Sequence, residues 1–205
     1  MAVAAMRYAA LGWPVCPGAR LRRRWDASSP GRACSCDRIG CPAPGAHPLS
    51  LAWQREASSD LAVVERWWST VPEPSILLVT GRTFDVLDVP AAAGSAALGR
   101  LEASGLRPGP VAAGSGGRTL FFVASRAALA EDDEWWSCHL DCEPDTVPAI
   151  TGLRWHTRDS YVLAPPSGLR GGTTARWLVP PDGAPLPDAL RLIGYLADAC
   201  EEIGR

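Results

Sequence analysis

Three cysteines and one histidine lie close together near the N-terminus. They are Cys34, Cys36, Cys41 and His47. Three thiolates and an imidazole are a ligand set typical of tetrahedral zinc, and four protein ligands leave no open position for water. The surrounding loop, about residues 26–50, holds few apolar residues, so a metal would supply order that a core cannot. We therefore predict a structural zinc ion, with reduced surface cysteines as the alternative because the spacing is not that of a standard finger.

A basic run ending in an aromatic residue precedes this cluster. It contains Arg22, Arg23, Arg24 and Trp25. Arginine binds phosphate and tryptophan can stack on a base, so the run is a candidate contact for single-stranded nucleic acid. A solvated loop explains it equally well, because all 20 basic residues of the chain are Arg. The absence of Lys and Asn is typical of GC-rich coding sequences, as in actinobacteria.

Two further segments are weaker candidates for chemistry. Cys138, His139, Asp141 and Cys142 could bind metal, but no further ligand set lies nearby, and incidental thiols explain them better. Ser115, Gly116, Gly117 and Arg118 form a turn whose backbone N–H groups could face a phosphate. A bare glycine turn between two strands is the commoner explanation of that pattern.

The composition limits where the protein works and what it contacts. Hydrophobic residues make up 47% of the chain, which allows a packed core, and the net charge of −2 gives no general attraction for DNA. No apolar run approaches the roughly 20 residues that span a bilayer, and the first residues do not resemble a signal peptide. The odd number of cysteines, seven, argues against a disulfide framework. We expect a cytoplasmic protein without a membrane partner.

The elements that must position these residues alternate between helix and strand. Helices are expected over 3–11, 60–70 (capped by Ser59 or Asp60), 94–104 and 187–203, and strands over 13–17, 75–80, 84–89, 118–123, 147–150, 161–164 and 176–179. The last helix should bury one face containing Leu190, Ile193, Leu196 and Ile203. This pattern predicts an α/β fold in one domain over 1–180, with a C-terminal helix in 181–205 packed on it.

Six short segments carry a resemblance to a known family. They are Ala9 to Val15, Cys41 to Leu49, Trp67-Trp68, Val86 to Val89, Ser115 to Arg118 and Tyr161 to Ser167. In this order they resemble the N-terminal domain of bifunctional DNA primase-polymerases, of the archaeo-eukaryotic primase superfamily, over most of residues 5–178. The resemblance implies a central sheet flanked by helices. It also supports the zinc assignment, since related actinobacterial members carry a similar loop.

The resemblance implies a catalytic site that this sequence has largely lost. Family members hold Mg²⁺ or Mn²⁺ on an Asp-x-Asp pair and a third aspartate, and a histidine after the glycine turn contacts the incoming nucleotide. Here Asp88 keeps the first position, while Pro90, Thr119 and Arg154 stand at the second carboxylate, the histidine and the third carboxylate. Asp85 lies an odd number of residues from Asp88 and faces the other way. His156 and Asp159 are nearby, but nothing in the sequence brings them to the site.

Three functions are consistent with this pattern. The first is a catalytically degenerate primase-polymerase-like domain that binds nucleic acid or nucleotide and acts with a partner such as a helicase or replication factor. The second is an active primase-polymerase, a template-directed nucleotidyltransferase, with a rebuilt metal site that would need Mg²⁺ or Mn²⁺. The third is a protein-interaction module without nucleic-acid binding. The missing carboxylates favour the first.

Overall fold

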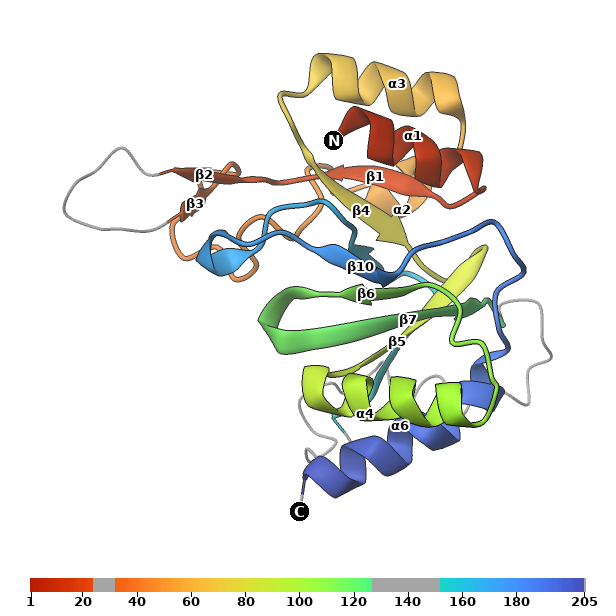
Figure 1. Ribbon diagram of the computed structural model, residues 1–205. Helices are drawn as coiled ribbons and strands as arrows, with labels where there is room; N and C mark the ends of the chain where they lie inside the picture. The colour runs from red at the N-terminus through yellow and green to blue at the C-terminus, as the bar shows by residue number, and fades with distance from the viewer. Residues whose placement is uncertain (24–31, 127–151, 205) are drawn as a thin grey trace. The chain divides into compact units, whose positions relative to one another are not determined.

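A computed structural model of the chain describes residues 1–23, 32–126 and 152–204 (Figure 1). The chain divides into two compact units, the first formed by Met1–Val79 and Tyr161–Arg176, and the second by Thr80–Ser160 and Trp177–Arg205. The expected strand at 147–150, the group from Cys138 to Cys142, and Arg24 and Trp25 lie outside the described residues.

The first unit is built on a three-stranded antiparallel sheet in the order β1-β4-β9. The strands are β1 (Val15–Gly18), β4 (Ser75–Val79) and β9 (Tyr161–Leu163). All of β4 is buried, as expected for a continuous apolar run covered on both faces. Helices α1 (Ala2–Ala10) and α3 (Leu61–Thr70) pack against each other and against β1 (Figure 1). Asp60 caps α3, as predicted, by accepting hydrogen bonds from the N–H groups of Ala62 and Val63.

The cysteine-rich loop of this unit has its own short elements. They are the hairpin of β2 (Leu21–Arg23) and β3 (Arg32–Cys34), followed by the helix α2 (Trp53–Glu56). The 3₁₀ turn η3 (Arg170–Gly172) belongs to the same unit but lies much further along the chain. Leu21 is the antiparallel partner of Cys34 in the hairpin. A small core formed by Cys16, Ala57, Leu77, Val79 and Leu163 packs beside Trp53. The loop is therefore anchored to the sheet by a few apolar contacts.

The second unit contains a five-stranded sheet in the order β10-β6-β7-β5-β8. The strands are β5 (Phe84–Pro90), β6 (Val111–Ala113), β7 (Arg118–Ala124), β8 (Arg154–His156) and β10 (Arg176–Val179). The 3₁₀ turn η1 (Ser115–Gly117) joins β6 to β7. Strands β6 and β8 were not expected from the sequence. Both have only three residues and are ordered by pairing with longer neighbours.

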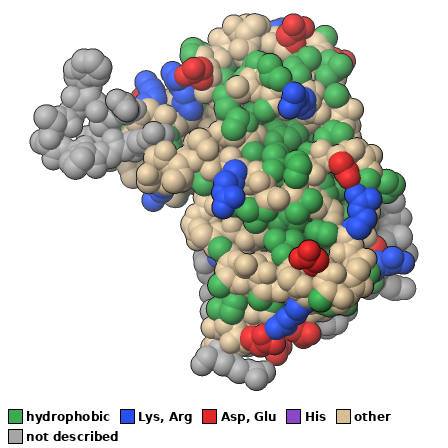
Figure 2. Space-filling view, in the orientation of Figure 1, with side chains coloured by type: hydrophobic (Ala, Val, Ile, Leu, Met, Phe, Trp, Pro, Cys, Tyr) green, Lys and Arg blue, Asp and Glu red, His purple; other side chains and the backbone are tan. Residues whose placement is uncertain are grey.

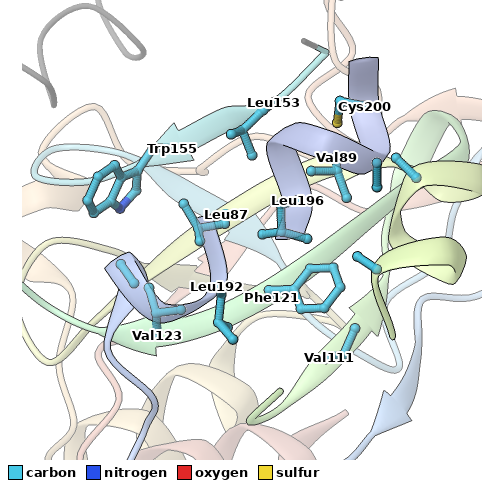
Figure 3. Packing of buried hydrophobic residues seen from close by; sticks show 14 of the residues in the cluster. Leu87, Val89, Val111, Phe121, Val123, Leu153, Trp155, Leu192, Leu196 and Cys200 are labelled. Carbon is cyan, nitrogen blue, oxygen red and sulfur yellow. The ribbon is translucent and has the colours of Figure 1, made fainter. Parts of the chain in front are cut away.

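Two helices, α4 (Ala91–Ala103) and α6 (Ala189–Ile203), cover one face of this sheet. Figure 3 shows the core they form, in which Leu192 and Leu196 of α6 meet Leu87, Val89 and Phe121 of the sheet. Because side chains alternate along a strand, Val86 and Asp88 point to the opposite face. The predicted α/β fold class is confirmed.

The buried face of α6 agrees only in part with the expected one. Leu196 is buried and Ile193 packs against the core, as predicted, but Leu190 and Ile203 are 57% and 47% exposed. The other buried residues of the helix are Ala189, Leu192, Ala199 and Cys200. Small side chains such as Ala189 and Ala199 let α6 approach its neighbours closely. Among the described residues, no helix is long and apolar enough to span a membrane.

Candidate functional site

The carboxylate of Asp88 lies on the sheet face that α4 and α6 leave uncovered in the second unit. Asp88 is paired with Leu120 of β7 on one side and with Arg154 of β8 on the other. Its side chain is only 8% exposed. A buried carboxylate needs partners that offset the loss of hydration, and both of its oxygens have one.

The first partner is Arg118, the last residue of the predicted glycine-turn segment. Its Nε donates to Asp88 Oδ1 at 2.6 Å, and its Nη2 donates to the backbone carbonyls of Asp88, at 2.9 Å, and Gly152. The Arg118 side chain is 19% exposed, so solvent screens this ion pair weakly. The guanidinium thus places a fixed positive charge against Asp88.

The second partner is His156 of β8. Its Nε2 lies 3.2 Å from Asp88 Oδ2, and its Nδ1 lies 2.9 Å from Ser160 Oγ. A neutral imidazole satisfies both contacts when Nε2–H donates to the carboxylate and Nδ1 accepts from the Ser160 hydroxyl. The pairing of Val86 with His156 in the β5–β8 register places the ring on the Asp88 face.

The other positions of the implied catalytic site do not join Asp88 in one constellation. Pro90 ends β5 and begins α4, and its ring packs near Gly152, where an added Cβ would lie 2.9 Å from Pro90 Cγ. Thr119 is buried on the opposite face against α4, where a methyl group on Gly94 would lie 2.5 Å from the Thr119 Cβ. Arg154 stands opposite Asp88 in register, and its side chain is exposed.

The glycine turn has a conformational explanation. Gly116 and Gly117 have φ values of 65° and 70°, a region that glycine enters without strain. A Cβ on either would meet no atom within 4 Å, so backbone conformation and not crowding requires glycine here. Among the four predicted nucleotide-binding residues, from Ser115 to Arg118, only Arg118 contacts Asp88.

Asp85 faces the helix-covered side of the sheet, as its odd spacing from Asp88 predicted. It is 1% exposed, and burial raises the pKa of its carboxyl above the ordinary value, even though the Arg126 N–H donates to Oδ2 at 3.4 Å. The carboxyl therefore cannot serve the Asp88 face.

The Cys/His cluster, formed by Cys34, Cys36, Cys41 and His47, comes together in the first unit. One ligand atom from each residue lies within 4.8 Å of all the others, the only such group among the described residues. A tetrahedral site with Zn–S bonds of about 2.3 Å places its ligand atoms about 3.8 Å apart. The set is therefore able to hold a metal ion, and its donors are those that zinc prefers.

Neighbouring backbone groups favour the metal-binding forms of two of these residues, His47 and Cys34. His47 Nδ1 lies 2.9 Å from the Pro48 carbonyl, so Nδ1 carries the hydrogen and the Nε2 lone pair points toward Cys34 Sγ, 3.2 Å away. Burial by itself would raise the pKa of the Cys34 thiol, but backbone N–H groups of Cys36 and Gly45 stabilise the thiolate and lower it to about 6. Gly45 has φ +77°, and a Cβ there would lie 2.6 Å from Leu21 Cγ.

Arg22 belongs to the support of this cluster. Its Nη2 donates to Asp37 Oδ2 at 2.7 Å and to the Ser35 carbonyl at 2.9 Å, which braces the turn that carries Cys36. These bonds give Arg22 a local structural explanation, and the nucleic-acid contact stays a prediction. Arg23 ends β2 opposite Arg32. On the face seen in Figure 2, basic and acidic side chains are interspersed.

The family model described as "Bifunctional DNA primase/polymerase, N-terminal" matches residues 5–189. No curated protein matches the chain. The matched segment includes both Asp88 and the Cys/His cluster.

Proposed function

Because the chain belongs to the family of bifunctional DNA primase/polymerase N-terminal domains, we propose that it is a primase-polymerase-like domain that has lost nucleotidyl transfer. It acts in the cytoplasm by binding nucleic acid or nucleotide together with a protein partner, such as a helicase or replication factor.

One observation carries this proposal: both carboxylate oxygens of Asp88 are already engaged, one by Arg118 and the other by His156. Two-metal nucleotidyl transfer needs several carboxylates to hold two divalent cations about 3.5–4 Å apart. Asp88 is the sole carboxylate on this face of β5, β7 and β8 in the described residues, and a guanidinium stands against it. The residues present do not fit a pair of divalent metals.

The Cys/His cluster has a separate, structural role in this proposal. We assign it to zinc because three thiolates and one imidazole favour that ion over Mg²⁺ or Mn²⁺, which prefer oxygen. With four protein ligands, a bound ion would have no open position for substrate. Zinc would hold the loop between β3 and α2 in place, where the apolar contacts are few.

A primer-synthesis and extension assay with Mg²⁺ and with Mn²⁺, run beside a DNA-binding titration, tests the proposal. We expect no template-directed addition by this chain alone. Robust extension that Asp88→Ala abolishes would show that the enzyme is active and overturn the proposal. The absence of binding to both DNA and nucleotide would favour the protein-interaction module.

A further inference from the structure

The charge on the Asp88 face differs in sign from that of a site built to hold divalent cations. The charged or titratable side chains that β5, β7 and β8 place there are Asp88, Arg118, Arg154 and His156. With a neutral imidazole, one negative and two positive charges sum to +1. A protonated imidazole makes the sum +2. The face therefore attracts anions and repels free metal cations.

Arg154 supplies the uncompensated charge. Arg154 is the register partner of Asp88, and the Cβ atoms of such partners lie about 4.5–5.5 Å apart. The Asp88 carboxylate nevertheless binds Arg118 and His156 and not Arg154. The Arg154 guanidinium makes no ion pair with any described residue. Its side chain is exposed, so its donors are open to a ligand.

Resting on the proposed function, we infer that this face binds a phosphate group directly, through Arg154, and that it needs no divalent metal to do so. Guanidinium N–H groups match phosphate oxygens in a planar, two-pronged contact. Because Arg118 already pairs with Asp88, Arg154 is left without an ion pair among the described residues. Phosphate groups of a nucleotide and of a DNA backbone share this chemistry.

The effect of Mg²⁺ on phosphate binding distinguishes this kind of site from one in which metal ions bridge protein and ligand. Where metal ions bridge carboxylates and phosphates, adding Mg²⁺ strengthens nucleotide binding. Here no carboxylate oxygen is free on the described part of the face, so Mg²⁺ would reduce the negative charge of the phosphates and weaken their attraction to Arg154. The sign of the Mg²⁺ effect therefore separates the two kinds of site.

The test is calorimetric titration of the full chain at low salt, with EDTA and then with millimolar Mg²⁺. The probes are dATP, inorganic tripolyphosphate, deoxyadenosine and a single-stranded oligonucleotide. We expect dATP and tripolyphosphate to bind in EDTA, deoxyadenosine not to bind, and Mg²⁺ to weaken both interactions. Arg154→Ala should weaken binding about tenfold, whereas Arg191→Ala, which removes the same charge from exposed α6, should not.

Each outcome bears on the inference. Competition between oligonucleotide and tripolyphosphate, lost in Arg154→Ala, supports the site and names the DNA backbone as the phosphate source. Tripolyphosphate binding that requires Mg²⁺, or that is equal in Arg154→Ala and wild type, overturns it. Complete lack of phosphate binding also overturns it. The proposed loss of nucleotidyl transfer fails by a different result, primer extension, so the two failures are distinguishable.

Discussion

Replacing Arg118 with Met should destabilise the second unit through a charge left behind in its interior. The substitution keeps much of the aliphatic stem but removes the guanidinium from Asp88, whose side chain is 8% exposed. Removing one partner of a buried ion pair costs about 3–5 kcal/mol, because the remaining charge is uncompensated. His156 still contacts Asp88, so we expect the lower end, about 3 kcal/mol. That loss is about a hundredfold in the folded-to-unfolded ratio.

Urea unfolding followed by tryptophan fluorescence measures this loss. With a slope of about 1–3 kcal/mol/M, the midpoint should fall by about 1–3 M. Arg107→Met is the matched control, because the Arg107–Asp182 pair is 74% and 58% exposed and solvent screens it. Its midpoint should stay near that of the wild type.

A double variant separates charge from packing. In Asp88→Asn with Arg118→Met no charge remains to be buried, so much of the lost stability should return relative to Arg118→Met alone. If Arg118→Met unfolds at the same urea concentration as Arg107→Met, or if Asp88→Asn gives no recovery, the argument that Asp88 is a buried, neutralised carboxylate is refuted.

Three other predictions follow from the described contacts. Cys36→Ala should abolish stoichiometric zinc in elemental analysis, because it removes one of the four ligands. Cys16→Ala, which removes a buried thiol outside the cluster, should retain the zinc. Zinc retained in both variants would refute the ligand assignment. Asp85→Asn should raise the urea midpoint of unfolding at pH 7 but not at pH 4. Burial raises the pKa of the Asp85 carboxyl in the folded state, so the stability of the wild type falls as the pH rises through that pKa, and the amide removes this loss. Equal effects at both pH values would contradict this. The Pro90→Asp variant should not bind Mn²⁺ in an electron paramagnetic resonance titration, because the Arg118 guanidinium still occupies Asp88. The double variant Pro90→Asp with Arg118→Leu should bind it, since Asp88 is then free. Mn²⁺ binding by Pro90→Asp alone would show that the guanidinium does not block the site.

The sequence predicts the elements that carry strong local signals. The runs ending at Val79 and at Val89 are apolar throughout and form β4 and β5, and Asp60 caps α3 as its side-chain chemistry requires. The Cys/His cluster assembles from the four predicted residues, because its members are close in sequence and depend little on the wider fold.

The contacts of Asp88 depend instead on strand register, which spacing within one strand does not determine. Arg118 reaches Asp88 because β7 pairs with β5, and His156 reaches it because β8 does. A signal for β8 was present, since Leu153, Arg154, Trp155 and His156 alternate apolar and polar residues, but three or four residues are too few to distinguish a strand from a loop. The engaged carboxylate was therefore beyond prediction from sequence alone.

The close contact between Gly94 and Thr119 also constrains the routes by which this protein can evolve. An imidazole at position 119 would need space that the backbone of α4 already fills, since even a methyl group on Gly94 would lie 2.5 Å from the Thr119 Cβ. Gly152, at φ +56°, likewise has no room for a Cβ beside the Pro90 ring. A metal site of the family's pattern would therefore require coordinated changes in helix, strand and loop. Single substitutions toward that pattern would first pass through less stable proteins.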